Sequence, residues 1–335
     1  EYMASSALVG RRPSSSLMEA YSSSLRPSSR WGMARSGVAA ASATVSGCST
    51  GRGARAPAGR AAARKSMRRR EELGKWGFLL PALTFMALFF GYPIVKNVTM
   101  SFQEYTTSTF YTGQAPWVGL SNYVSVLTSS VFSTAMLNTF LFTVGSIAGQ
   151  FTIGLALAIF FKRRFPLNGV MRSLILLPWL LPMIVSSAIW KWMLDKDSGV
   201  VNQLLQAVNL PVVPWLTSTS VALIAVIIVN IWLGIPFNMT ILYSGLQDIP
   251  DELYEAASLD GAVGWKAFRY VTWPLLKPVV SVVLVLGVVY TLKVLDIILG
   301  LTGGGPSNAT QTLATQSYKL SFTNFEFGQG AALGN

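Results

Sequence analysis

The sequence predicts an all-α, polytopic transmembrane helix bundle, and three observations lead to that fold class. Hydrophobic residues make up 51% of the chain and charged residues only 12%, a charged share about half that of average soluble proteins. The mean hydropathy is +0.47 although residues 1–66 are polar. Beyond that polar segment, apolar runs long enough to cross a membrane as helices follow one another.

The polar N-terminal segment, residues 1–66, is rich in Ser, Ala, Arg and Gly. It carries ten Lys/Arg and two acidic residues, and therefore most of the net charge of +12. Such a composition cannot bury enough apolar surface to offset its ordering entropy, which predicts disorder. Its basic residues lack aromatic platforms, so they do not indicate nucleic-acid binding. An organelle transit peptide and translation upstream of a natural start at Met67 both fit, and we favour the second.

The first span is predicted at residues 76–95, where about 20 residues rising ~1.5 Å each cover a hydrocarbon core of ~30 Å. The second span is predicted at 135–161 and the third at 170–190. Pro178 and Pro182 should kink the third span, which is tolerated where neighbouring helices pair the freed carbonyls.

The fourth and fifth spans are predicted at 221–243 and 275–299. A sixth span is expected to begin near Phe327 and to run past Asn335. The predicted fold is therefore five complete spans plus a missing sixth, so that residues 67–335 form one transmembrane domain with a truncated C-terminal span.

A polar island, residues 244–275, separates the fourth and fifth spans. Asp251 and Glu252 suit the positive end of a helix that starts near Pro250. Gly261 can end this helix in a left-handed conformation that other residues resist. A second short helix is expected at 264–272, and Pro274 would start the next span. The island thus predicts a helix–turn–helix knob with a contact face and no catalytic group.

The distribution of Lys and Arg predicts the orientation of the bundle. One side collects Arg68, Arg69, Arg70, Lys75, Lys162, Arg163, Arg164, Arg172, Lys266, Arg269 and Lys277. The other side has only Lys96, Lys191, Lys196 and Lys319. By the positive-inside rule, the first side is cytoplasmic, and so are the knob and the N-terminus.

The knob carries a family resemblance. The order Glu255-Ala-Ala, Gly261, Pro274 resembles the cytoplasmic coupling loop of ABC importer permeases. The longer string Gln-Asp-Ile-Pro-Asp-Glu-Leu-Tyr-Glu-Ala-Ala-Ser-Leu-Asp-Gly-Ala at 247–262 resembles the carbohydrate-uptake branch, the maltose and glycerol-3-phosphate type. Val271 and Trp273 replace the Ile and Leu usual in the family. The resemblance covers residues 75–335.

This resemblance implies a permease subunit of a binding-protein-dependent importer in the bacterial inner membrane, which takes up a sugar by alternating access. The implied partners are a second, homologous permease, an ABC ATPase dimer, an extracytoplasmic solute-binding protein, the carbohydrate and membrane lipid. ATP and Mg²⁺ would bind to the ATPase, since this chain has no Gly-rich loop ending in Lys-Ser/Thr. No cofactor or metal is therefore expected in the chain. The implied coupling residues are Glu255, Ala256, Ala257, Asp260, Gly261 and Pro274.

Asn230 is a candidate solute-binding residue in the fourth span. In Val229-Asn-Ile-Trp-Leu-Gly234 it resembles the maltose-type helix whose Asn and Gly face the sugar, which implies a similar role for Gly234. An unpaired amide is costly at mid-membrane, and an amide offers both a donor and an acceptor to hydroxyl groups. A hydrogen bond between helices explains Asn230 equally well.

Three further candidates lie near the outer end of the fifth span. Lys293 and Asp296 are three residues apart, so they could form an ion pair within the helix or line the sugar path. Tyr290 could stack on a sugar ring or simply pack.

Other function classes stay open at this point. A permease for a non-sugar solute, such as a polyamine or phosphate, shares the knob. A stand-alone channel and an intramembrane enzyme are weaker alternatives. The chain has no His and one Cys, which excludes His-based catalysis, disulfides within the chain and His- or Cys₄-type zinc sites.

Overall fold

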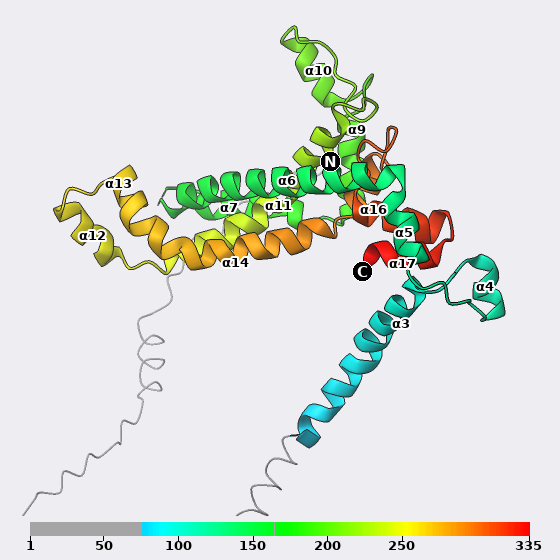
Figure 1. Cartoon of the computed structure of the whole chain (residues 1–335). Helices are drawn as coiled ribbons and strands as arrows, with labels where there is room; N and C mark the ends of the chain where they lie inside the picture. Colours follow the sequence, from blue (N-terminus) through cyan, green and yellow to red (C-terminus); the bar gives the residue numbers. More distant parts are fainter. Residues whose placement is uncertain (1–75, 164) are drawn as a thin grey trace, which may run out of the picture. The chain divides into compact units, whose positions relative to one another are not determined.

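A computed structural model describes residues 76–163 and 165–335, and most of these residues are helical (Figure 1). The predictions for residues 1–66 and for the basic residues 68–70, 75 and 164 lie outside this part. Within it, extended pairing is limited to isolated bridges, Gln103 with Trp117 and Thr106 with Glu326. The all-α prediction is confirmed.

Four helices in the described part are long and apolar enough to cross a membrane: Trp76–Ser101, Ser130–Lys162 (α6), Ala222–Gln247 (α11) and Trp265–Leu292. A bent pair, Asn168–Leu180 with Met183–Met193, provides a fifth candidate. These match the five predicted spans in number and order. Most of their ends lie beyond the predicted ones, whereas the fifth span ends before its predicted end.

Shorter elements subdivide and connect these spans. They are η1 (Ala87–Gly91), α3 (Tyr92–Ser101), α4 (Thr107–Thr112), α5 (Ser121–Thr128), α7 (Asn168–Ile175), α8 (Leu177–Leu180), α9 (Met183–Met193), α10 (Val200–Ala207), α12 (Asp251–Leu259), α13 (Trp265–Ala267), η2 (Phe268–Thr272), α14 (Trp273–Leu292), α15 (Asp296–Leu301), α16 (Leu313–Tyr318), η3 (Lys319–Thr323) and α17 (Phe327–Gly334). Helix α17 begins where the sixth span was predicted to begin. It contacts α3, α5 and α16.

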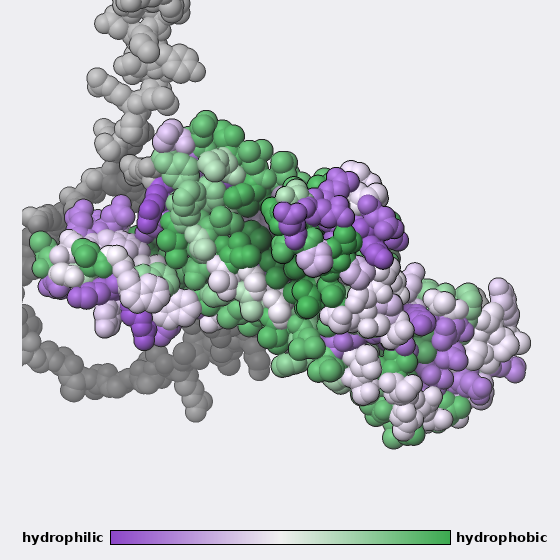
Figure 2. All heavy atoms as spheres, turned by 90° about the horizontal axis from the view of Figure 1, so that it is seen from above, coloured by the Kyte–Doolittle hydropathy of each residue, from purple (hydrophilic) through white to green (hydrophobic). Residues whose placement is uncertain are grey.

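The centre of the bundle consists of α6, α11 and α14, which run side by side (Figure 1). Gly145, Gly149 and Gly154 of α6 face α11, where an added Cβ would press on the side chains of Ile227, Ile231 and Asn238 respectively. Small residues at such contacts let two helix backbones approach closely. Figure 2 shows hydrophobic residues over the middle of the bundle and hydrophilic residues towards its two ends, as a lipid-facing surface requires.

The third span is broken rather than kinked. Helices α7 and α8 meet α9 at a bend of 98°. At the break, Leu181 and Pro182 are extended, with ψ of 137° and 136°. A residue before proline avoids the helical region, so Pro182 forces this break, while Pro178 sits harmlessly in the first turn of α8.

The fifth span departs from the prediction at its start. Instead of a separate helix at 264–272 and a new one at Pro274, one helix runs from Trp265 to Leu292. It passes through the π-helical turn η2, in which the Trp273 N–H donates to the Phe268 carbonyl five residues earlier. Proline normally clashes with the carbonyl four residues before it. We attribute the continuity to the wider π turn, which moves that carbonyl.

The fifth span also ends earlier than predicted, at Leu292 rather than at 299. The chain then turns and forms α15, whose Ile297, Ile298 and Leu301 are buried. Gly300 lies so close to Ser187 of α9 that a Cβ would collide with it. Packing of α15 on α9 thus overrides continuation of α14.

The loop after α9 is fixed by Asp195. Its carboxylate accepts hydrogen bonds from the Ser198 backbone N–H at 2.9 Å and from the Ser198 hydroxyl at 2.8 Å. The backbone bond is the larger cause of a pKa held below the usual value for Asp195.

Candidate functional sites

Helix α12 forms the first half of the knob, and its two ends match the sequence prediction. It begins after Pro250, with Asp251 and Glu252 in its first turn. It ends at Gly261, whose φ of +74° is the left-handed conformation. The Gly261 N–H donates to the Ser258 carbonyl at 3.0 Å, and the Ala262 N–H donates to the Ala257 carbonyl at 2.8 Å. This paired arrangement is a Schellman cap, which gives α12 a fixed end.

Five of the six predicted coupling residues lie together on α12 and its cap. Glu255, Ala256, Asp260 and Gly261 are exposed, and Ala257 is half-buried. Pro274 lies apart from them, in the first turn of α14. Leu259, at 89% exposed, adds an apolar group to the same surface. Their role in coupling stays a prediction.

Tyr254 joins α12 to the bundle. Its hydroxyl is 3.0 Å from the Thr272 hydroxyl of η2. The Lys162 ammonium, at the end of α6, lies 4.0 Å from the centre of the Tyr254 ring. Sequence analysis placed Tyr254 in the family-like string but gave no sign of these contacts, because both partners are distant in the chain.

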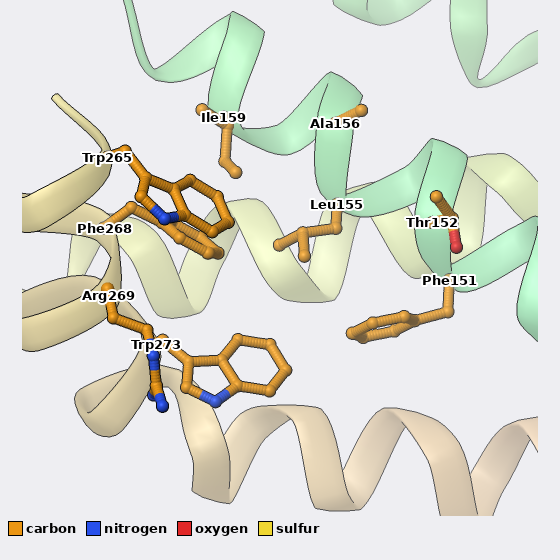
Figure 3. Close-up of a pocket in the computed structure, with 9 residues that line it drawn as sticks. All are labelled: Phe151, Thr152, Leu155, Ala156, Ile159, Trp265, Phe268, Arg269 and Trp273. Atoms are coloured by element: carbon orange, nitrogen blue, oxygen red, sulfur yellow. The ribbon is translucent and has the colours of Figure 1, made fainter.

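The second half of the knob meets α6 across an open apolar groove of about 610 Å³ (Figure 3). Trp265 stacks on Phe268 at 5.1 Å between ring centres. Phe151 and Leu155 of α6 lie opposite, and Arg269 extends beside Trp273. Because the groove separates the two walls, this part of the knob is not closely packed against α6.

A cavity of about 430 Å³ lies among α8, α9, α11, α14 and α15. The structure brings all five predicted solute-binding residues to its lining: Asn230, Gly234, Tyr290, Lys293 and Asp296. Their role in binding a solute stays a prediction, but their proximity is a property of the fold.

The side-chain nitrogen of Asn230 is buried and has no hydrogen-bond partner among the described residues. The bond between helices is made instead by Gln150 of α6, whose Nε2 donates to the Asn230 backbone carbonyl at 2.9 Å. Asn238 adds a third side-chain amide to this group. Its Nδ2 donates to the Gly234 carbonyl at 2.9 Å and to Gln150 Oε1 at 3.4 Å. Gln150 and Asn238 were missed by sequence analysis.

Gly234 makes room for the Gln150 amide. A Cβ at Gly234 would overlap the side-chain amide of Gln150. Gly234 therefore permits the contact between α6 and α11 that holds Gln150 in the cavity wall.

Aromatic side chains form another wall of the cavity. The Phe237 ring lies 6.2 Å from the Trp179 ring and 5.7 Å from the Tyr290 ring, edge-on to the latter. The Lys293 ammonium lies 4.8 Å from the centre of the Tyr290 ring. No ion pair joins Lys293 to Asp296 in the described structure, because α14 ends before Lys293 and Asp296 begins α15. Of the two alternatives for Lys293 and Asp296, the ion pair within one helix is therefore absent from the described structure, and the position in the cavity lining remains.

Sequence relatives cover this fold and both sites. Residues 150–334 match the family described as binding-protein-dependent transport system inner membrane component. The trehalose/maltose transport system permease protein MalF of Thermococcus litoralis is 35% identical over 261 residues, covering 77% of this chain and 87% of that protein. The diacetylchitobiose uptake system permease protein DasB of Streptomyces coelicolor is 30% identical over 268 residues, covering 78% and 81%.

Solved structures agree on the fold. A bacterial ABC transporter involved in the import of the acidic polysaccharide alginate matches with a TM-score of 0.70 and 23% identity, over 81% of this chain and 92% of that chain. The spans, the knob and the relatives lead to one assignment: the chain belongs to the binding-protein-dependent transport system inner membrane components, the permease subunits of ABC importers.

Proposed function

We propose that this permease carries a neutral carbohydrate through the cavity at Asn230 and that a separate ATPase drives it through α12. The observation that carries the proposal is the buried, unpaired Asn230 Nδ2 in the lining of that cavity. An unpaired donor in an apolar interior costs about 1–3 kcal/mol. A solute hydroxyl that accepts this hydrogen bond removes the cost.

The other walls suit a sugar. Binding sites combine apolar surface with a few placed polar groups, and the ring faces of Phe237 and Tyr290 supply apolar surface. The charged residues in the lining are Lys293 and Asp296. Because their charges cancel, the cavity does not favour a polyamine or phosphate. The printed names of trehalose/maltose and diacetylchitobiose permeases support the same solute class.

The orientation proposed for the chain is N-terminus and knob in the cytoplasm. Lys162, Arg163 and Arg172 line a cavity together with Asp251 of α12, and Lys266 and Arg269 lie in α13 and η2 next along the chain. The positive-inside rule assigns this end of the bundle to the cytoplasm. There an ATPase dimer, which binds ATP and Mg²⁺, would dock on α12.

The remaining partners are a second, homologous permease and an extracytoplasmic solute-binding protein. Helix α12 suits its proposed role because it is short and has a Schellman cap at its C-terminal end. A rigid element transmits a displacement of the ATPase as a rigid-body movement of the spans. No chemistry on the solute is assigned to this chain.

The test uses the complete importer in lipid vesicles with its solute-binding protein. ATP hydrolysis and uptake are measured with maltose, trehalose, diacetylchitobiose, spermidine and phosphate. Stimulation by at least one neutral saccharide is expected. Stimulation by spermidine or phosphate alone would replace the carbohydrate assignment, and uptake without ATP would replace the ATP-driven mechanism.

A further inference from the structure

A second cavity, the basic basin, lies where the end of α6, the start of α7, the end of α11 and the start of α12 meet. Its volume is about 950 Å³, and its charged lining residues are Lys162, Arg163, Arg172 and Asp251. Three cations against one carboxylate leave an excess of positive charge. The basin therefore attracts anions.

The cations of the basin form no ion pair with the described residues. The Arg172 guanidinium lies 4.7 Å from the centre of the Tyr243 ring. The Lys162 ammonium lies 4.0 Å from the centre of the Tyr254 ring, and its nitrogen is buried without a hydrogen-bond partner in the described part of the chain. A buried ammonium that contacts only an aromatic face has lost more hydration than the ring restores. An added anion would offset this loss.

The walls of the basin are held in place by hydrogen bonds. Asn168 Nδ2 donates to the Phe161 carbonyl at 2.9 Å and to the Arg163 carbonyl at 2.6 Å, which ties α7 to the end of α6. Gln247 Nε2 donates to the Tyr243 hydroxyl at 2.7 Å and fixes the ring beneath Arg172. The positions of the cations are thus set by the fold before any anion arrives.

Exposed apolar side chains continue from the basin along α7. Leu167 is 71% exposed, and Val170, Met171 and Leu174 are also exposed. These side chains suit contact with acyl chains. A basic pocket between spans at the cytoplasmic boundary, next to an apolar surface, fits the headgroup of an anionic lipid.

We propose that the basic basin binds the phosphate headgroup of an anionic phospholipid, and that this lipid stabilises α12 through the contact between Lys162 and Tyr254. The effect on α12 and the cytoplasmic position of the basin rest on the proposed function, whereas the attraction of an anion rests only on the contacts above. The phosphate accepts hydrogen bonds from the two arginines, the buried Lys162 ammonium adds its charge beneath them, and the acyl chains lie against α7.

The experiment measures lipids retained by the complete, purified importer. Complexes are equilibrated in detergent with equal amounts of phosphatidylglycerol and phosphatidylcholine, and retained lipids are read by native mass spectrometry. The basin variant carries Arg163→Gln and Arg172→Gln. The matched control carries Lys266→Gln and Lys277→Gln, two exposed cations outside the basin lining.

The native complex should retain phosphatidylglycerol preferentially. The preference of the basin variant for phosphatidylglycerol should be about 25-fold lower, since each of the two removed arginines contributes roughly fivefold near an anionic surface and the two factors multiply. The control should keep the native preference. Equal retention of the two lipids by the native complex, or equal loss in both variants, would overturn the proposal. Lipid retention is measured without solute or ATP, so its outcome does not depend on which solute the importer carries.

Two further experiments distinguish a lipid headgroup from other sources of the anion. Inorganic phosphate added to complexes in phosphatidylcholine nanodiscs should not raise their melting temperature, whereas phosphatidylglycerol nanodiscs should. A rise with inorganic phosphate alone would assign the basin to free phosphate. A photo-crosslinker at Gly169→Cys, a lining position where an added Cβ meets open space, should capture lipid. Capture of the ATPase instead would assign the basin to an acidic protein segment.

Discussion

The knob and the solute cavity are built in opposite ways. Helix α12 has no buried residues, and Tyr254 joins it to the rest of the chain through a hydrogen bond to Thr272 and the Lys162 ammonium. The cavity lies between closely packed helices, where Gln150, Asn230 and Asn238 are all buried. A helix such as α12, which is held by few contacts, can move as a unit, whereas the residues that line a binding cavity must keep their positions.

This difference separates stability from function. A substitution on α12 removes few internal contacts, so it should leave the fold intact and change the response to a partner. A substitution in the cavity changes buried hydrogen bonds and packing, so its effect on stability should be measurable as well.

The largest effect is expected from Glu255→Lys on α12. Reversing an exposed charge at a docking surface costs about 2–5 kcal/mol of binding when its partner is buried against it, so uptake should fall ~30-fold or more. Melting temperature and solute binding should stay unchanged, because Glu255 is exposed and its side chain forms no hydrogen bond or ion pair within the described part of the chain. Uptake into vesicles measures the loss of transport, and co-purification with the ATPase measures the loss of binding between the two subunits.

Glu104→Lys is the matched control for Glu255→Lys. Glu104 is also exposed, and the change in net charge is identical, but the residue lies before α4, far along the chain from the knob. Uptake by this variant should be normal. Normal uptake by Glu255→Lys would remove the coupling assignment, and loss of uptake in both variants would reduce it to an effect of net charge.

The knob was largely predictable from sequence, because its signals are local. Asp251, Glu252 and Gly261 mark the ends of α12 through backbone chemistry within a few residues. The same local reasoning failed at Pro274, since a π turn accommodated the proline. It also failed after Leu292, where packing of α15 on α9 ended the helix.

The cavity was predictable only in part. Asn230 stood out as an amide in an apolar span, and Gly234 was implied by the resemblance of Val229–Gly234 to the maltose-type helix. Gln150 could not be identified in this way, because its contacts with α11 depend on the register between α6 and α11. That register depends on contacts such as Gly149 against Ile231, which no local pattern specifies.

A second prediction concerns Asn230→Leu in the cavity. Removing the unpaired Nδ2 donor should raise stability by about 1 kcal/mol, since an unsatisfied buried group costs ~1–3 kcal/mol. Solute affinity should fall about 10-fold, because the same donor is lost to the solute. Thermal unfolding and solute-stimulated ATP hydrolysis give the two values.

A rise in stability together with a fall in solute affinity in Asn230→Leu would support the contrast between the knob and the cavity. A lower melting temperature for Asn230→Leu would mean that the amide has a structural partner. The assignment of Asn230 to the solute would then be withdrawn. The Gln150 bond to the Asn230 carbonyl offers an internal control, because the backbone acceptor is unchanged by the substitution.

A third prediction compares two glycines in the same cavity lining. In Gly234→Ala the Cβ would displace the Gln150 amide, and overpacking of this kind costs about 1–3 kcal/mol. In Gly287→Ala the Cβ would meet only Ile147, at 3.8 Å, an ordinary contact. Thermal unfolding should therefore separate the two variants. Equal melting temperatures would show that Gln150 can shift freely and that the wall is not rigid.

The smallest effect is expected at Tyr290. Tyr290→Phe keeps the ring that packs on Phe237 and lies beneath Lys293, so solute affinity should change less than ~2-fold if the ring face is what the solute contacts. Tyr290→Leu removes the ring face from the solute, an aromatic contact worth about 1 kcal/mol, and should weaken solute affinity ~5-fold. Titration of solute-stimulated ATP hydrolysis distinguishes these cases. A large loss in Tyr290→Phe would show that the hydroxyl, rather than the ring face, holds the solute, and the cavity would then depend on hydrogen bonds at both walls.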